Sequence, residues 1–307
     1  MDIIILLVGF SIGLVLLVKG ADEMVSSAVQ IALKFKLPSS IIGATFIGFG
    51  TSAPELFAST GAALKGDLDL GIGNIVGSNI ANSLLVVAVL YLALPKDFSQ
   101  KIKLNQISPV WMAILTTVFV STYVINNEFP FLLGAVLLIL VIYVIYKMIS
   151  TESVDEGELL GEEKNYIWLR GGLSLLATLY GSQLVVDNAV AIAELFGVSS
   201  LIIGSTIIAI GTSLPEVAGT ISAAKMRKPD IVFGNIFGSN LFNIGLVGAT
   251  AIMISPGEIS SVIDYQLFIM YFVSFIVIFL SRNVIKRNSL LGYLFIVAYI
   301  LFLVSLF

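Results

Sequence analysis

The chain has 307 residues, of which 58% are hydrophobic and only 12% are charged, and its formal net charge is −4. Soluble domains carry about 25% charged residues, so this composition excludes an ordinary soluble protein. Cysteine and histidine are both absent, which excludes disulfides, thiolate nucleophiles, imidazole bases and the usual zinc ligands.

Apolar stretches follow one another from end to end of the chain. Charged and turn-forming residues divide them into segments at about 3–35, 39–64, 70–94, 104–125, 129–149, 166–196, 199–224, 231–254, 262–281 and 289–306. Each is long enough to cross the ~30 Å hydrocarbon core of a bilayer as a helix. The first has no basic segment before it and no small-residue cleavage site, so we interpret it as a span and not as a removable signal. The pattern predicts an all-α, polytopic membrane protein with ten transmembrane helices.

The second predicted span contains the sequence GTSAPE, which ends at Glu55. Proline inside a helix removes one backbone hydrogen bond and clashes with the preceding turn, so Pro54 predicts a break or kink near mid-membrane. Gly50 makes local unwinding easier, and Thr51 and Ser52 add hydroxyl oxygens at the same point. A glutamate at this depth is costly and by default marks a functional site.

The third predicted span contains GNIVGSNIAN, which ends at Asn82. Asn79 and Asn82 are three positions apart and therefore share one helical face. Gly73 and Gly77 permit close approach of another helix. Buried amides of this kind can join neighbouring helices or face a bound ion, and we expect Asn82 to face Glu55.

An acidic segment, residues 150–165, follows the fifth predicted span. It divides the chain into a first five-helix repeat (1–149) and a second one (166–307). Its carboxylates could bind a regulatory calcium ion, but a charge run of this kind is more often a solvated loop, which is our interpretation.

The two halves of the chain resemble each other. Residues 39–86 and 200–247 are identical at 23 of 48 positions at an offset of 161, and the second copy contains GTSLPE, ending at Glu216, and GNIFGSNLFN, ending at Asn243. Because each half holds an odd number of predicted spans, the second enters the membrane from the opposite side. Inverted repeats with a site near the bilayer midplane are common in secondary transporters, and alternating access explains why one polar motif occurs twice.

The distribution of lysine and arginine predicts the orientation, because these residues are enriched in cytoplasmic loops. With the N-terminus outside, only Lys65 falls in an outer loop. The cytoplasmic segments then hold Lys34, Lys36, Lys96, Lys101, Lys103, Lys147, Lys164, Arg170, Lys225, Arg227, Lys228, Arg282, Lys286 and Arg287. We therefore expect a protein of the cell membrane with both termini outside and the acidic linker in the cytoplasm.

The polar groups of the motif-bearing spans indicate a cation site. They offer carboxylate, amide, hydroxyl and backbone carbonyl oxygens, which calcium and sodium prefer, whereas transition metals favour nitrogen and sulfur. Two carboxylates would neutralise one calcium ion. A purely structural role would pair each glutamate with a basic residue, but no lysine or arginine occurs at a comparable depth in the sequence.

The motifs GTSAPE, GTSLPE, GNIVGSNIAN and GNIFGSNLFN resemble the alpha repeats of the calcium/cation antiporter superfamily, in its prokaryotic sodium/calcium exchanger branch. The resemblance covers nearly the whole chain. It implies an ion site between the second, third, seventh and eighth spans. The ligands that it implies are Glu55, Glu216, Thr51, Ser52, Thr212, Ser213, Ser78, Ser239, Asn82 and Asn243, with backbone carbonyls of Gly48 and Ala209.

One position departs from part of the superfamily. Some relatives, including potassium-dependent ones, carry aspartate where this chain has Asn243. Asparagine resembles the potassium-independent exchangers and leaves two strong charges in the site, so the ion stoichiometry stays open.

Taken together, residues and resemblance predict a secondary antiporter that exchanges sodium for calcium by alternating access. Its expected partners are these two ions and the lipid bilayer, with no cofactor, no nucleic acid and a monomeric working state. Proton-coupled calcium or cation exchange is the alternative, because a midplane glutamate can carry a proton. A channel is disfavoured by the broken, inverted helices, and an intramembrane enzyme by the absence of histidine, cysteine and an aspartate dyad.

Overall fold

A computed structural model describes residues 3–101, 107–151, 166–198, 207 and 209–306. Within these residues, seven helices are long and apolar enough to cross a membrane. A further pair, Ser39–Thr51 and Ala53–Leu64, passes the same test as one span bent by 45°. The predicted linker 150–165 and the first part of the predicted seventh span fall almost entirely outside the described residues.

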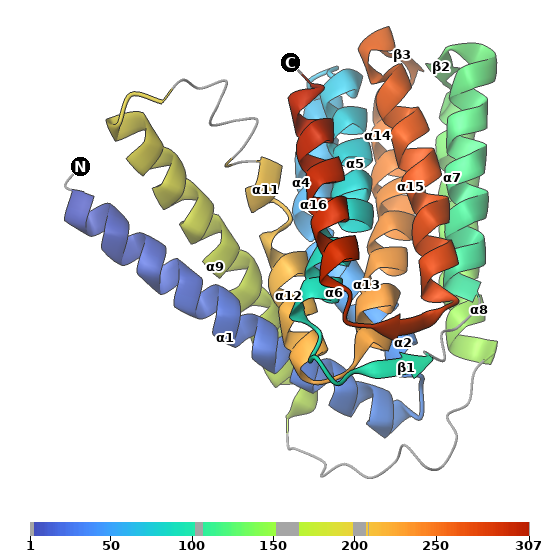
Figure 1. Cartoon of the computed structure of the whole chain (residues 1–307). Helices are drawn as coiled ribbons and strands as arrows, with labels where there is room; N and C mark the ends of the chain where they lie inside the picture. The colour runs from blue at the N-terminus through green and yellow to red at the C-terminus, as the bar shows by residue number, and fades with distance from the viewer. Residues whose placement is uncertain (1–2, 102–106, 152–165, 199–206, 208, 307) are drawn as a thin grey trace.

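The elements follow one another as a helical bundle (Figure 1). The first half comprises α1 (Ile3–Phe35), α2 (Ser39–Ile42), η1 (Gly43–Ile47), α3 (Gly48–Thr51), α4 (Ala53–Leu64), α5 (Leu68–Ala81), η2 (Asn82–Val86), α6 (Val87–Ala93), β1 (Ser99–Lys101), α7 (Ile107–Asn126), β2 (Glu128–Phe129) and α8 (Phe131–Thr151). The second half comprises α9 (Ile167–Leu195), α11 (Ala209–Gly211), α12 (Leu214–Lys225), α13 (Pro229–Phe242), η5 (Asn243–Gly248), α14 (Ala249–Ile254), β3 (Gly257–Glu258), η6 (Ser261–Ile263), α15 (Asp264–Ser281), β4 (Val284–Lys286) and α16 (Ser289–Val304).

The helix α1 packs along α9, and the two lean away from the remaining bundle toward the N-terminus (Figure 1). Small residues allow this close packing. A Cβ added at Gly20 would lie 2.7 Å from the hydroxyl of Thr178, and one added at Gly181 would lie 2.4 Å from the backbone nitrogen of Leu17. Gly20 matches Gly181 at the repeat offset, and Leu17 matches Thr178, so the contact is made twice with exchanged roles.

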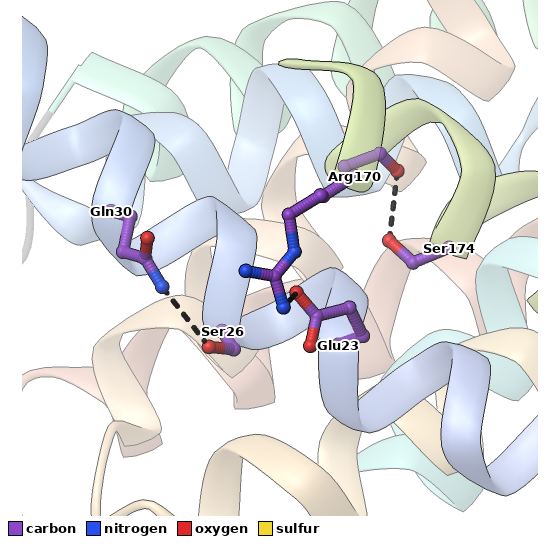
Figure 2. A network of polar contacts seen from close by, with 6 residues as sticks. Glu23, Ser26, Gln30, Arg170 and Ser174 are labelled. Carbon is purple, nitrogen blue, oxygen red and sulfur yellow. Dashed lines mark hydrogen bonds and ion pairs between the residues drawn. The ribbon is translucent and has the colours of Figure 1, made fainter. Parts of the chain in front are cut away.

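Polar side chains join the same two helices near the start of α9. Figure 2 shows Arg170 of α9 reaching Glu23 of α1, with 2.7 Å between the guanidinium and the carboxylate. On α1, Gln30 donates a hydrogen bond to Ser26. This ion pair accounts for one of the acidic residues of the first span without giving it a role in ion binding.

Two short antiparallel ribbons join loops of the first half to loops of the second. β1 pairs with β4, and β2 pairs with β3. The β2/β3 ribbon lies at one end of the bundle and the β1/β4 ribbon at the other (Figure 1). At the β1/β4 end, Arg227 also bonds Asp97 at 2.6 Å, and this guanidinium holds the pKa of the Asp97 carboxyl below its usual range.

The motif-bearing helices α5 and α13 begin at opposite ends of the bundle. Asp69, in the first turn of α5, accepts a hydrogen bond from the backbone of Ser260, shortly after β3. α13 begins just after Arg227, whose partner Asp97 lies shortly before β1. Both helices span matching positions at the repeat offset, since Leu68 corresponds to Pro229.

The described structure is nearly all helical, as predicted, except for the two ribbons. The spans have close to their expected limits; the third, expected at 70–94, runs from Leu68 to Ala93. Among the described residues, wider π-helical segments interrupt the helices at η1, η2 and η5. Such segments are frequent at functional sites, and two of them begin at Asn82 and Asn243, which were predicted as ligands.

Candidate cation site

The two GTS-x-PE motifs form matching helix breaks. Ser52 separates α3 from α4 with φ −84° and ψ 1°, and Ser213 precedes α12 with φ −93° and ψ 3°. Pro54 and Pro215 each lie within the first turn that follows, where proline is tolerated because the missing N–H has no helical acceptor. The predicted break of the second span is therefore confirmed. Each break places a glutamate, Glu55 or Glu216, in the first turn of the new helix.

These breaks are not ordinary helix caps. Serine at the cap position followed by glutamate three residues later is the pattern of a capping box, in which both side chains bond the free backbone N–H groups. Neither Ser52 nor Ser213 makes a capping hydrogen bond. The Ser52 hydroxyl is buried and has no partner among the described residues, so it remains available for another ligand.

Glu55 and Glu216 lie buried beside each other. They are 3% and 2% exposed, and their carboxylates interact electrostatically. Ser78 donates a hydrogen bond of 3.2 Å to Oε1 of Glu55, and the Thr51 side chain contacts the carboxylate of Glu216. Among the described residues, no lysine or arginine forms an ion pair with either glutamate. Two close carboxylates in a buried site are costly unless a cation balances their charge or one of them binds a proton.

Four asparagines interlock the motif helices of the two halves. Nδ2 of Asn82 donates to Oδ1 of Asn240 at 3.1 Å, and Nδ2 of Asn243 donates to Oδ1 of Asn79 at 3.0 Å. At the repeat offset, Asn82 matches Asn243 and Asn79 matches Asn240, so the second bond is the first with its roles exchanged. Ser83 accepts a further bond from Asn240. The amide nitrogens of Asn82 and Asn243 thus hold helices together and leave their carbonyl oxygens for other contacts.

Several buried oxygen atoms near these motifs have no hydrogen-bond partner among the described residues. They include Oε2 of Glu55, Oε2 of Glu216, Oδ1 of Asn243 and Oγ of Ser52. All four belong to residues that the sequence predicts as ligands. A buried acceptor without a partner is costly, and coordination of a hard cation would satisfy oxygen atoms of this type.

The remaining predicted ligands have different surroundings. Ser239 is fully buried and donates a hydrogen bond of 3.3 Å to the carbonyl of Gly48, which brings two predicted ligands together. Ser78 lies partly exposed next to Glu55. Ser213 is buried, whereas Thr212 is exposed. The side chain of Ala209 lies outside the described residues.

Two cavities reach the motifs from the same end of the molecule. One of about 420 Å³ extends from Gln266 and Leu306 to Ser78 and Ser213. Another of about 400 Å³ extends from Glu194, near the end of α9, along that helix. Both are lined by Thr212. Because Gln266 and Leu306 lie near the start of α15 and the end of α16, these cavities belong to the β2/β3 end.

Three residues support the predicted ligands or motifs in a way that the sequence did not predict. Asn79 and Asn240 hold the predicted ligands Asn243 and Asn82 in place. Ser182 of α9 donates a hydrogen bond of 3.2 Å to the carbonyl of Gly211, directly before Thr212. The asparagines were visible as a helical pair in the sequence, but no sequence signal distinguishes the one that faces a ligand from the one that faces a helix.

Comparison with known proteins shows the family to which the chain belongs. The sequence profile described as sodium/calcium exchanger protein matches residues 5–151 and 166–307. The chain belongs to the sodium/calcium exchanger family. The family assignment that the repeated motifs predicted is thereby confirmed.

Several known proteins resemble this chain over most of its length. The sodium/calcium exchanger MaX1 of Methanosarcina acetivorans is 32% identical, over 96% of this chain and 97% of its own. The inner membrane protein YrbG of Escherichia coli (strain K12) is 31% identical, over 89% of this chain and 88% of its own. The solved structure of the sodium-calcium exchanger NCX_Mj soaked with 2.5 mM Na⁺ and 0.1 mM Ca²⁺ matches with a TM-score of 0.82 and 29% identity, covering 99% of each chain. Together with the apolar helices, these matches identify a multi-pass membrane protein of a transporter family.

Proposed function

We propose that the protein is a secondary antiporter that exchanges sodium for calcium at a site between the two halves. The observation that carries the proposal is the pair of buried carboxylates, Glu55 and Glu216, at matching helix breaks with unpartnered oxygens around them. Two negative charges balance one calcium ion, and several sodium ions can replace it on the same oxygens. Similarity to MaX1 and NCX_Mj, both named as sodium/calcium exchangers, supports the choice of ions.

The proposed ligands are those implied by the motifs. They are the side chains of Glu55, Glu216, Thr51, Ser52, Thr212, Ser213, Ser78, Ser239, Asn82 and Asn243 and the carbonyls of Gly48 and Ala209. Asn79 and Asn240 act as positioning residues, because each accepts the amide hydrogen of a ligand asparagine. Their bonds leave Oδ1 of Asn243 directed away from Asn79 and free to coordinate.

We further propose that the halves are inverted five-helix repeats that alternate between two conformations. The opposite starting ends of α5 and α13 and the exchanged asparagine bonds support inversion. The described surroundings of matching glycines also differ. A Cβ added at Gly234 or Gly238 would lie 2.2 or 2.3 Å from a carbonyl oxygen of Ser40 or Ala44. One added at the matching Gly73 or Gly77, which line a cavity, would meet no described residue within 4 Å, and the positions that match Ser40 and Ala44, 201 and 205, lie outside the described residues.

This asymmetry suggests which contacts are exchanged between the two proposed conformations. α13 is tightly packed and α5 lines the open cavity, and likewise Thr51 is fully buried while the matching Thr212 is exposed. If the second conformation reverses these roles, Gly77 takes on the close contact that Gly238 makes here. The cavity at the β2/β3 end then closes and an equivalent one opens at the β1/β4 end.

Alanine at the two glycines tests this alternation. Gly77→Ala is compatible with the present packing but obstructs the reversed one, so we expect it to favour the open cavity at the β2/β3 end. Gly238→Ala is the matched control with the opposite effect, because its Cβ clashes here. The measurement is the labelling rate of a cysteine introduced at Gln266, which lines the cavity. Equal rates in both variants would contradict the reversal of roles.

The orientation and setting remain proposals of the same kind. We propose a monomer in the cell membrane with both termini outside and residues 150–165 in the cytoplasm. The support is the location of Lys96, Arg227 and Lys286 at the β1/β4 end, together with the enrichment of such residues in cytoplasmic loops. On this assignment the two described cavities open outward.

Calcium uptake into proteoliposomes separates sodium coupling from proton coupling. Purified protein is reconstituted with sodium inside and calcium outside at equal pH on both sides, and in a second set with only a proton gradient. We expect uptake that requires internal sodium and persists when the pH gradient is abolished. Uptake driven by the proton gradient alone would favour the proton-coupled alternative, and single-channel conductance would contradict antiport.

A further inference from the structure

An apolar groove of about 640 Å³ runs along the outside of the bundle between α15 and α16. Val273 and Ile276 line it from α15, Leu291 and Ala298 line it from α16, and Leu84 of η2 forms its floor. Large apolar side chains around it are exposed, so in a bilayer this groove faces the hydrocarbon. It is a hollow that a single chain-like molecule can fill.

Charge distinguishes the two ends of the groove. Arg282, at the end of α15, and Lys286, on β4, are exposed and form no ion pair with a described side chain. The charged side chains on β3 and in the first turn of α15, at the β2/β3 end, are acidic, namely Glu258 and Asp264. A negatively charged group is therefore attracted to the β1/β4 end and repelled from the other.

We propose that this groove binds an anionic phospholipid, with one acyl chain between α15 and α16 and its phosphate at Arg282 and Lys286. The groove is long enough for an acyl chain of one leaflet. On α16 its lining runs from Leu291 to Ser305, a rise of roughly 21 Å, and one leaflet contributes about half of the ~30 Å hydrocarbon core. Clusters of basic residues beside transmembrane helices are suited to anionic headgroups.

Phe302 connects this groove to the cavity beside the glutamates. Phe302 is 6% exposed and lines both spaces. An acyl chain in the groove therefore contacts a residue that also lines the cavity, together with Ser78 and Thr212. A lipid that fills the groove therefore supports the position of α16 relative to α5. This consequence for ion transport rests on the proposed function, whereas lipid binding does not.

Lipid binding is measured without ions or flux. Purified protein in detergent is titrated with phosphatidylglycerol or with phosphatidylcholine, and bound lipid is counted by native mass spectrometry alongside the thermal unfolding midpoint. We expect phosphatidylglycerol to bind about tenfold more tightly than phosphatidylcholine, a difference of about 1.4 kcal/mol, and to raise the midpoint more. Equal binding of the two lipids by the unaltered chain would overturn the proposal.

Variants locate the site. The double change Arg282→Gln with Lys286→Gln should abolish the preference for phosphatidylglycerol, and Ala298→Phe, which fills the groove, should abolish retention of either lipid there. Two matched controls should bind lipid like the original chain. Lys225→Gln changes an exposed lysine at the same end, and Val297→Phe changes a residue of α16 that is 51% exposed. Unchanged lipid binding in both test variants would overturn the site. Cross-linking that shows a second copy of the chain covering the groove would also overturn the proposed lipid site. If a variant fails to fold, the titration of the unaltered chain still decides.

Discussion

At the scale of single residues, the two glutamates are equivalent in sequence but not in surroundings. Glu55 accepts a hydrogen bond from Ser78, which lines the open cavity. Glu216 lies against Thr51, which is fully buried. On the proposed function, a cation that enters from the β2/β3 end would meet the Ser78 side of the site first, and the buried side would complete its coordination.

Glutamine at either glutamate should abolish calcium exchange. Glu55→Gln and Glu216→Gln each keep the size of the side chain and remove one of two charges that balance the ion. We expect sodium-driven calcium uptake to fall about 100-fold or more, equivalent to roughly 2.7 kcal/mol of lost ion stabilisation, with the thermal unfolding profile retained. Glu258→Gln, an exposed carboxylate on β3, is the control. Near-normal uptake in a purified glutamine variant would remove that residue from the site.

Asn243 bears on the question of potassium. Its amide is fully buried and its oxygen has no hydrogen-bond partner among the described residues. An amide supplies a dipole where a carboxylate would supply a full charge, and contacts to charged groups are roughly twice as strong. We therefore expect exchange to proceed at the same rate with and without potassium in the liposomes. Flux that appears only after potassium is added would contradict this reading.

Replacing the amide by a carboxylate provides the complementary experiment. Asn243→Asp adds a third negative charge beside Glu55 and Glu216 and should change the ion preference or stoichiometry. The fold should survive, because Asn79 can rotate its amide to donate the hydrogen bond that it now accepts. The ratio of sodium to calcium transported, measured with both isotopes, reports the change.

At the scale of helices, the sequence predicted the breaks but not the wider turns. Pro54 and Pro215 lack a backbone N–H and cannot continue a helix, so their effect is local and visible in sequence. The π-helical turns at η2 and η5 depend on packing between halves that are far apart in the chain. Such a turn changes the helical face of the residues that follow it, so regular helical spacing could not orient the residues after Asn82 and Asn243.

The ribbons were also beyond prediction from sequence. β2 contains only Glu128 and Phe129, and its partner β3 lies far away in the chain. A strand of this length has no recognisable periodicity, and it exists because folding brings two loops to the same end of the bundle. The helical spans, by contrast, follow from hydrophobic length, which is a local property.

The α1–α9 contact offers a test at the same scale. Alanine at Gly181 would place its Cβ 2.4 Å from the backbone of Leu17, so we expect a loss of about 1–3 kcal/mol in stability. An added Cβ at Gly172, on the same helix, would meet no described residue within 4 Å. Gly172→Ala should be neutral or stabilising by up to about 1 kcal/mol. Thermal unfolding in one detergent compares the two, and an equal loss in both would argue against close packing at Gly181.

At the scale of the whole molecule, contacts between loops that are distant in sequence occur at both ends of the bundle. Asp69 contacts Ser260 at one end, while Asp97 contacts Arg227 at the other. Each contact joins the first half to the second, as do the two ribbons. Which end faces the cytoplasm follows only from the distribution of basic residues.

Cysteine labelling tests that orientation directly. The chain contains no cysteine, so a single introduced thiol gives an unambiguous signal. We expect Glu156→Cys and Lys286→Cys to react with an impermeant maleimide only from the cytoplasmic side, and Asp69→Cys only from outside. Labelling of positions 69 and 156 from the same side would contradict the inverted arrangement of the halves.

The hydrogen bond from Ser182 to the Gly211 carbonyl has a consequence for the history of the chain. The residue that matches Ser182 in the first half is Ala21, which is buried and has no hydroxyl. In an assembly of two identical gene products, both positions would necessarily carry the same side chain. Here the two positions have separate codons, so one motif could acquire a support that its twin lacks, and natural selection could adjust the two motifs independently.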